Sequence, residues 1–277
     1  MAIGIFDSGI GGLTVLKEVR RLIPDRRMIY LGDTARVPYG IRSPEIVVRY
    51  SLENAAFLVS RGIQLLVVAC NTSSSVAIEA LEKKYDMPIV GVIEPGSRAA
   101  VRATKRGRVA VLGTPATINS GAYPRAIARL DAGIKVIGQA CPLFVPLVEE
   151  GWHEHEATRL TAREYIHKIH NRDPDIDTIV LGCTHYPLLK PLLKKVVEGV
   201  FNHPVTFIDS ALETAITVKK LLDEGLPVAQ CPAEEFDSVT YYITDFPVRF
   251  KEVGSLFLDE KIEIAEVVSL PSYEVVS

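Results

Sequence analysis

The sequence predicts an α/β protein with two similar lobes, each a mostly parallel sheet flanked by helices, related by a pseudo-twofold axis with the functional site between them. Short apolar runs alternate with amphipathic helical stretches at the spacing of βα units, which is typical of parallel sheets. This series of strands occurs twice along the chain, and in each series one strand ends in a cysteine, Cys70 or Cys183. The turn at Asp7 precedes Cys70 by nearly the same spacing as Thr114 precedes Cys183, which favours two related lobes.

The predicted strands fall into two series. The first comprises Ala2–Phe6, Met28–Gly32, Leu65–Ala69 and Ile89–Val92. The second comprises Arg108–Leu112, Lys135–Ala140, Thr178–Leu181 and Thr206–Ile208. Helix starts support this register, because Pro44 follows Ser43 as a helix-opening pair and Ser210 with Glu213 fits a capping box.

These series predict a first lobe made of residues 1–96 together with 210–277, on the Cys70 side. The second lobe is predicted to span residues 97–209, on the Cys183 side. The C-terminal tail has another helical pattern and two further predicted strands, and we expect it to return to the first lobe; the strands are Ser238–Ile243 and Ile262–Val267.

Composition points to a small-molecule partner. The 277 residues are 48% hydrophobic, enough for a sizeable core, and 31 basic residues nearly balance 34 acidic ones. This balance argues against nucleic acid or a membrane surface as the main partner. The N-terminus lacks a cationic leader and no apolar run is long enough to cross a bilayer, so we expect a cytoplasmic protein. A homodimer is left open.

Cysteine usage favours free thiols. Four cysteines in a cytoplasmic chain of this length, with no C-x-x-C pair, argue against a disulfide framework and against zinc. Two of them, Cys141 and Cys231, receive no predicted role. A single buried cysteine at a strand end is usually a small hydrophobe. The matched settings of Cys70 and Cys183, each at the start of a helical segment, instead favour two facing thiols that move protons on both sides of one carbon.

The glycine-rich turn from Gly4 to Gly12 joins the first strand to a helix and can hold an anion on backbone N–H groups. It lacks the spacing and the lysine of phosphate-binding loops, and Asp7 would repel a phosphate. A ligand that carries both a carboxylate and an ammonium group fits better, with Asp7 and Ser8 beside it. The alternative is an ordinary turn in which one of these two residues caps the helix.

Several polar residues follow other strands. The loop from Asp33 to Gly40 bends around Tyr39 and is interpreted either as a cover over the site or as a plain surface turn. Candidate donors to a developing negative charge are Asn71, Thr72 and Thr184. Thr114 and Thr117 would hold a carboxylate, cap a helix, or do both.

His185 lies two positions after Cys183 and is interpreted as a proton donor, a relay or a cap. A metal site of Cys70, Cys183 and His185 would lack a full ligand set, so no metal is predicted. Glu149 and Glu150 are interpreted either as helix caps or as residues that face the cleft, and Glu149 is retained as a site candidate.

Six segments closely resemble the glutamate racemases, within the cofactor-independent aspartate/glutamate racemase superfamily: IGIFDSGIGGLTVL, YLGDTARVPYG, VVACNTSSS, VIEPG, LGTPAT and LGCTHYPLL. The resemblance spans nearly the whole chain. It implies a two-lobed enzyme that interconverts L- and D-glutamate without pyridoxal phosphate or metal, and that supplies D-glutamate for peptidoglycan, the cell wall and cell shape.

The resemblance also implies roles for individual residues. Cys70 and Cys183 would be the two acid/base residues, with Asp7 and His185 tuning them. Substrate contacts would come from Ser8, Tyr39, Gly40, Asn71, Thr72 and Thr184, and further positions from Asp33, Thr114, Thr117 and Glu149. Two rival functions stay open. One is a relative that acts on aspartate or another α-substituted acid. The other is a ligand-binding regulator or a nucleotide-dependent protein in which the glycine-rich turn holds phosphate.

Overall fold

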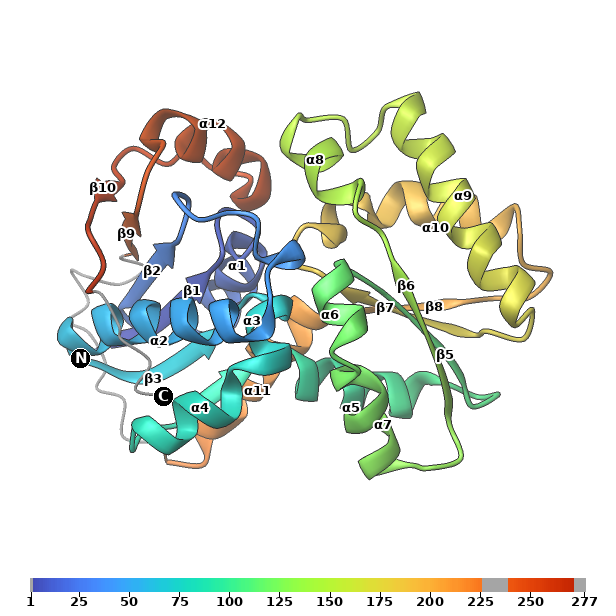
Figure 1. The fold of residues 1–277 in the computed structure, drawn as a ribbon, viewed down its shortest axis with the longest axis horizontal. Helices are drawn as coiled ribbons and strands as arrows, with labels where there is room; N and C mark the ends of the chain where they lie inside the picture. Colours follow the sequence, from blue (N-terminus) through green and yellow to red (C-terminus); the bar gives the residue numbers. More distant parts are fainter. Residues whose placement is uncertain (1, 226–238, 272–277) are drawn as a thin grey trace.

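The computed structural model describes residues 2–225 and 239–271 and contains two separate sheets with parallel strands (Figure 1). Helices flank both sheets, so the predicted α/β class with two similar lobes is confirmed. Cys231 and the start of the predicted strand at Ser238 lie outside the described residues. No described helix combines the length and apolar composition needed to cross a bilayer.

The first sheet has six strands in the order β10-β9-β2-β1-β3-β4. The strands are β1 (Ala2–Asp7), β2 (Met28–Gly32), β3 (Ile63–Val68), β4 (Ile89–Gly91), β9 (Val239–Ile243) and β10 (Glu266–Val267). β1 is paired on both edges, by β2 and β3, and is buried along its whole length, so it is an interior strand of this sheet.

The second sheet has four strands in the order β6-β5-β7-β8. The strands are β5 (Arg108–Gly113), β6 (Lys135–Ala140), β7 (Thr178–Gly182) and β8 (Thr206–Asp209). This order repeats β2-β1-β3-β4 of the first sheet, so the two series have the same layout, as predicted. The strand that leads to Cys183 therefore occupies the same place in its sheet as the strand that leads to Cys70.

Successive side chains of β1 point to opposite faces of the first sheet, and each face is covered by a layer of helices. Ile3 and Ile5 pack with α1 and α12 on one face, whereas Phe6 packs with α2 on the other. The helices and the short 3-10 turn of this half are α1 (Leu13–Leu22), α2 (Pro44–Ser60), α3 (Asn71–Val76), α4 (Ile78–Lys84), α12 (Pro247–Leu258) and η1 (Tyr39–Ile41).

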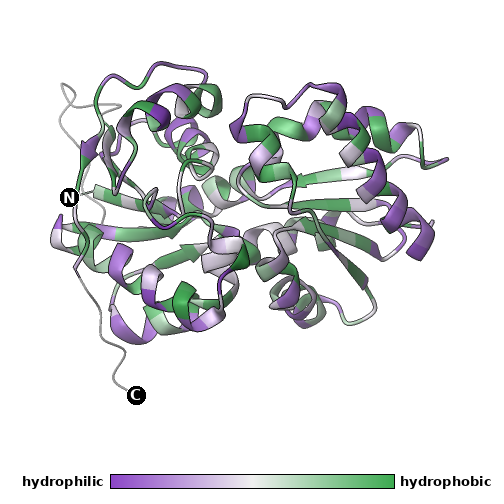
Figure 2. Ribbon diagram, turned by 45° about the horizontal axis from the view of Figure 1, so that its top comes forward, coloured by the Kyte–Doolittle hydropathy of each residue, from purple (hydrophilic) through white to green (hydrophobic). Residues whose placement is uncertain are grey.

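The second sheet is likewise covered on both faces, and hydrophobic strands lie between more hydrophilic outer helices (Figure 2). Its helical segments are α5 (Ile93–Ala103), α6 (Pro115–Asn119), α7 (Ala122–Leu130), α8 (Phe144–Glu149), α9 (Glu156–Arg172), η2 (Tyr186–Leu189) and α10 (Lys190–Glu198). The remaining helix, α11 (Ser210–Asp223), packs against α1 and α5 and so joins the two halves. One hydrophobic cluster contains residues of both sheets.

The tail returns to the first sheet, where β9 pairs with β2 and β10 pairs with β9. The predicted strand Ile262–Val267 is wrong over its first four residues, since β10 begins at Glu266. Ile262 instead packs over Gly254, where an added Cβ would lie 2.7 Å from its Cδ1 atom. The exact bounds of the lobes, 1–96 with 210–277 and 97–209, stay a prediction.

The predicted capping box at Ser210 is also wrong by one position. The N-cap of α11 is Asp209, whose Oδ1 accepts a hydrogen bond from Ala211 N at 3.0 Å. Ser210 instead donates its hydroxyl to Leu181 O at 3.1 Å and so ties α11 to β7. At α2 the predicted start is confirmed, with Ser43 at the N-cap and Pro44 in the first turn, although the Ser43 side chain makes no capping bond.

Candidate functional site

A cavity of about 280 Å³ is lined by residues that follow the carboxyl ends of strands from both sheets. Open parallel sheets bind ligands at this edge. The lining includes Ser8 and Gly9 after β1, Tyr39 and Gly40 after β2, Cys70 to Thr72 after β3, Thr114 after β5, Cys141 after β6, and Cys183 to His185 after β7. A larger hollow of about 510 Å³ among α4, α5 and α7 contains neither Cys70 nor Cys183, so the chemistry places the site in the smaller one.

Cys70 is the N-cap of α3, which confirms its predicted place between a strand and a helix. Its Sγ accepts a hydrogen bond from Ser73 N at 3.5 Å and lies 3.6 Å from Ser8 Oγ. Burial and the nearby charge of Asp7 nevertheless raise the pKa of Cys70 to about 11, against the opposing effect of Ser73 and Ser8. Desolvation is therefore a larger effect on this thiol than the hydrogen bond from the helix N-terminus.

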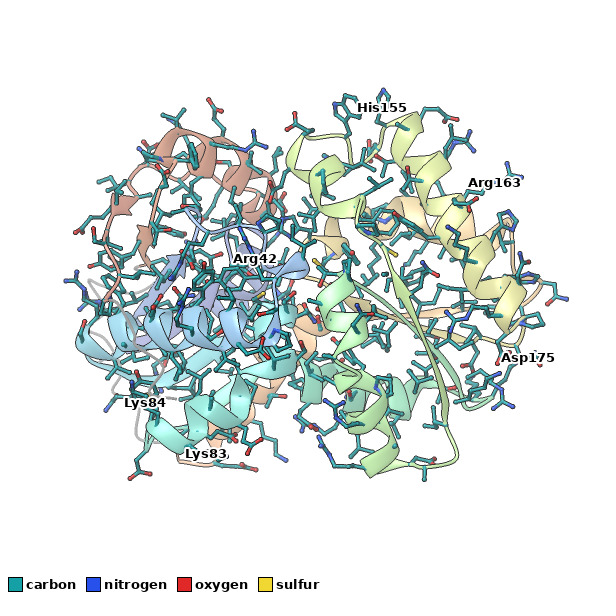
Figure 3. All side chains as sticks on the ribbon, viewed as in Figure 1. Arg42, Lys83, Lys84, His155, Arg163 and Asp175 are labelled. Carbon is teal, nitrogen blue, oxygen red and sulfur yellow. The ribbon has the colours of Figure 1, made fainter. Side chains whose placement is uncertain are left out.

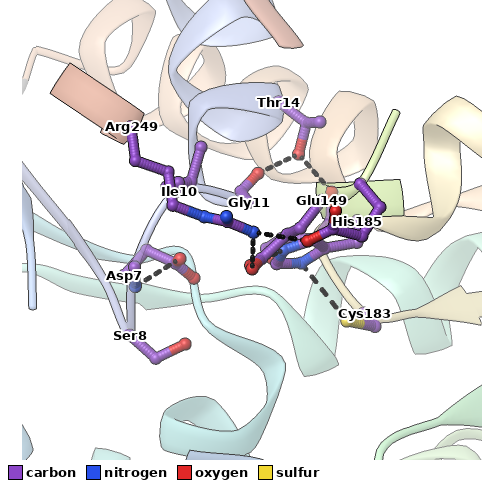
Figure 4. A network of polar contacts seen from close by, with 12 residues as sticks. Asp7, Ser8, Ile10, Gly11, Thr14, Glu149, Cys183, His185 and Arg249 are labelled. Carbon is purple, nitrogen blue, oxygen red and sulfur yellow. Dashed lines mark hydrogen bonds and ion pairs between the residues drawn. The ribbon is translucent and has the colours of Figure 1, made fainter. Parts of the chain in front are cut away.

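Cys183 is buried beside an imidazole. Its Sγ lies 3.9 Å from Nδ1 of His185, and Nε2 of His185 lies 2.9 Å from Oε1 of Glu149 (Figure 4). Burial disfavours a charged imidazole, but the bonds to Cys183 and Glu149 outweigh it and raise the pKa of His185 to about 10. The imidazole of His185 is therefore held in its charged form between the Cys183 sulfur and the Glu149 carboxylate.

Asp7 lies at the end of β1 and is fully buried. Its Oδ2 accepts a hydrogen bond from Gly9 N at 2.9 Å, whereas Oδ1 has no hydrogen-bond partner among the described residues. Burial raises the pKa of Asp7, and the charge of His185 with the amides of the turn partly offsets that rise. A buried acceptor without a partner is a place where a bound cation or donor would be stabilised.

The glycine-rich turn contacts the Cys183 loop directly. A Cβ on Gly11 would lie 2.3 Å from both Nδ1 of His185 and Oγ1 of Thr184. Thr14 donates a hydrogen bond to Thr184 O at 3.0 Å, from α1 of one lobe to the loop of the other. Because Gly11 has no side chain, the backbone of this turn can lie directly against Thr184 and His185 of the other lobe.

Three hydroxyl groups meet across the lobes. Oγ1 of Thr72 lies 3.0 Å from that of Thr114 and 3.3 Å from that of Thr117. Thr114 also caps α6 by accepting a hydrogen bond from Thr117 N at 3.2 Å, so capping by Thr114 is confirmed, and the role of these threonines in holding a carboxylate stays a prediction. Asn71 donates Nδ2 to Tyr123 OH at 2.9 Å, and its buried Oδ1 has no partner among the described residues.

Three of the predicted site residues, Asp7, Asp33 and Thr117, do not line the cavity, whereas all the others do. Asp33 lies behind the cavity wall, where Oδ2 accepts hydrogen bonds from the Tyr39 hydroxyl and from Arg36 Nε, and Oδ1 accepts one from Thr244 at 3.0 Å. Nδ2 of Asn54 completes the network with a 3.1 Å bond to the Tyr39 oxygen. The predicted loop at 33–40 is thus held against the site by a buried polar network, and Thr117 reaches the cavity wall through Thr72 and Thr114.

Sequence reasoning missed four residues at or beside the cavity: Thr14, Tyr123, Cys141 and Arg249. Cys141 follows a strand end just as Cys70 and Cys183 do, so that pattern could have found it. Arg249 comes from the C-terminal tail and carries no local signal. Among the described residues, no group of three or more His, Cys, Asp or Glu side chains is arranged to hold a metal ion.

The family model described as Asp/Glu/Hydantoin racemase matches residues 11–218. A glutamate racemase from Geobacter metallireducens is 52% identical over 269 residues, covering 97% of each chain. The crystal structure of a glutamate racemase from Francisella tularensis in complex with D-glutamate has a TM-score of 0.88 at 34% identity, covering 98% of each chain. A glutamate racemase isoform from Bacillus anthracis gives the same TM-score and coverage at 36% identity. The chain belongs to the Asp/Glu/Hydantoin racemase family.

Proposed function

We propose that the protein racemises glutamate at its α-carbon by proton transfer between two thiols, without a cofactor, and thereby supplies D-glutamate for peptidoglycan. One observation carries the proposal: Cys70 and Cys183 follow equivalent strands of the two sheets and line the same cavity. Glutamate as substrate is supported by relatives named glutamate racemase and by the Francisella tularensis structure with D-glutamate.

In the proposed reaction one thiolate removes the α-proton and the opposite thiol delivers a proton to the other face of the planar carbanion. The donor thiol becomes the thiolate, so the roles of Cys70 and Cys183 exchange with the direction of reaction. Removal of a proton beside a carboxylate requires preorganised donors in a site that excludes water. Asn71, Thr72 and Thr184 line the cavity and are the proposed donors.

The two thiols are tuned differently. His185 provides Cys183 with a neighbouring positive charge, whereas the charge of Asp7 contributes to the raised pKa of Cys70. Asp7 is buried and does not line the cavity, so its charge would act on Cys70 from behind the cavity wall. A substrate ammonium group in the cavity would offset that charge and favour ionisation of Cys70 only when substrate is bound.

We propose that the substrate carboxylates are held by uncharged donors. Apart from His185, the lining contains a single basic side chain, Arg249, among the described residues. The hydroxyl groups of Ser8, Thr72 and Thr114 and the backbone around Tyr39 and Gly40 would supply hydrogen bonds instead. This donor set leaves both faces of the α-carbon free for the thiols.

The proposal includes a cytoplasmic location and a small-molecule partner, with neither nucleic acid nor membrane. Cys70, Cys141 and Cys183 are all free thiols, and thiols persist in a reducing compartment. A homodimer is compatible with the proposal, which needs residues of one chain only.

The test is incubation of L-glutamate and, separately, L-aspartate with the purified protein and no added cofactor, following optical rotation. We expect glutamate to lose its rotation and aspartate to lose it far more slowly. Cys70→Ala and Cys183→Ala should each abolish the change. Faster racemisation of aspartate would favour the rival substrate, whereas full activity in either variant would contradict the two-thiol mechanism.

A further inference from the structure

Arg249 lies near the start of α12 and reaches across to the second lobe (Figure 4). Helix α12 packs against α1, on the first sheet, whereas α8 follows β6 of the second sheet. The Nη2 atom of Arg249 lies 3.1 Å from Oε1 of Glu150 and 3.9 Å from Oε2 of Glu149. These ion pairs therefore join the two lobes at the wall of the cavity.

The two oxygens of Glu149 meet cations from different directions. Oε1 lies 2.9 Å from Nε2 of His185, and Oε2 faces Arg249. The carboxylate torsion of glutamate is soft, so a single contact would leave the group free to turn. The positive charge of Arg249, 3.9 Å from Oε2, favours the orientation in which Oε1 is directed at His185.

The Glu149–His185 contact is more buried than the Glu149–Arg249 contact, and the two therefore differ in strength. The side chain of Glu149 is 24% exposed and that of His185 is 8% exposed, whereas that of Arg249 is 50% exposed. Ion pairs with an exposed partner contribute little to stability because water screens them. The Arg249 contact can therefore break and re-form as substrate passes, without unfolding of either lobe.

We propose that Arg249 is a positioning residue for the Cys183 half of the reaction, holding Glu149 so that it keeps His185 directed at Cys183. Arg249 contacts Glu149, which contacts His185, which in turn contacts Cys183. Because Arg249 belongs to the opposite lobe, this chain of contacts is complete only when α12 and α8 lie against each other. The inference rests on the proposed function, since it assigns a role within that reaction.

The kinetic test compares Arg249→Gln with Arg249→Lys and with Arg163→Gln, an outward-pointing arginine on α9 that serves as a matched control (Figure 3). We expect Arg249→Gln to lower kcat/KM about fivefold, the size of a partly exposed ion pair. Arg249→Lys should recover most of the loss, and Arg163→Gln should leave the rate unchanged. On a Glu149→Gln background, Arg249→Gln should have no further effect, because its target is already gone.

A second readout does not depend on racemase activity. In the full-length protein labelled with ¹⁵N-histidine, the proton on Nε2 of His185 should give a protected signal, assigned by its loss in His185→Gln. We expect Arg249→Gln to broaden this signal through solvent exchange and Arg249→Lys to retain it. An unchanged signal in Arg249→Gln, or a further loss of rate on the Glu149→Gln background, would overturn the inference. If the wild-type protein does not racemise glutamate, the proposed function fails and the signal still decides the role of Arg249.

Discussion

Gly11 and His185 are in direct contact across the two lobes, so that a methyl group on Gly11 would lie 2.3 Å from Nδ1 of the imidazole. That nitrogen is the one that faces Cys183. The backbone of one lobe therefore sets the position of the His185 imidazole in the other. A glycine-rich turn that resembles an anion-binding loop in the sequence acts here as a packing surface.

Gly11→Ala is expected to displace His185 from Cys183 and to lower kcat/KM about a hundredfold, since misplacement by about 1 Å has effects of that size. The matched control is Gly199→Ala, where an added Cβ makes only an ordinary contact of 3.5 Å with Val196 O. Steady-state kinetics with both variants checks this. Equal activity in the two variants would show that the contact is not needed.

Glu149→Gln is expected to lower the pKa of His185, because it removes one of the two contacts that raise it to about 10. Loss of the imidazolium charge would then occur at lower pH, so the alkaline limb of the kcat/KM profile should move to lower pH. The profile measured from pH 6 to 11 checks the direction, which follows from the reference value of about 6.5 for histidine. An alkaline limb that stays in place would mean that Glu149 does not control His185.

The pH dependence of stability follows from the same group. The pKa of His185 is raised on folding, so its contribution is fully present below about pH 6.5 and is lost as pH rises through about 10. We expect the free energy of unfolding of the wild-type protein to fall over that window. Urea denaturation of the wild type and of His185→Gln checks it, and the fall should be smaller in the variant.

Thr72→Val removes one hydroxyl from the cluster that Thr72 forms with Thr114 and Thr117. If the cluster holds a substrate carboxylate, loss of one charge-assisted hydrogen bond should raise KM about tenfold. Thr161→Val on the distant helix α9 is the control, because its hydroxyl bonds only to Ala157 O within its own helix. An unchanged KM in Thr72→Val would place the carboxylate elsewhere.

Asp33→Ala should act on stability rather than on substrate binding, because Asp33 is buried behind the cavity and not on its wall. The change strips the Tyr39 hydroxyl, Thr244 and Arg36 of their shared acceptor. We expect a loss of about 3 kcal/mol of unfolding free energy, the size of a broken buried ion pair. Chemical denaturation measures it, and a normal stability with a raised KM would instead identify Asp33 as a substrate contact.

The fold and most of the residues that line the cavity could be predicted from local sequence patterns. Strands and helix starts follow from hydrophobic periodicity and capping residues, which are visible within a few residues of sequence. Because the carboxyl ends of parallel strands lie at one edge of a sheet, the sequence also predicted that Cys70 and Cys183 lie in one site. The raised pKa of Cys70 could not be predicted, because desolvation depends on what the folded chain packs around the thiol. Thr14 and Arg249 were missed for the same reason, since their partners are distant in sequence.

In the proposed reaction, two thiols serve opposite faces of one carbon. The most direct measurement is the isotope content of both enantiomers early in the conversion of L-glutamate in deuterated water. We predict that newly formed D-glutamate carries deuterium at the α-carbon while the remaining L-glutamate keeps protium, because each thiol handles one face. D-glutamate that retains protium, or L-glutamate that exchanges as fast as it racemises, would indicate a single base and contradict the account.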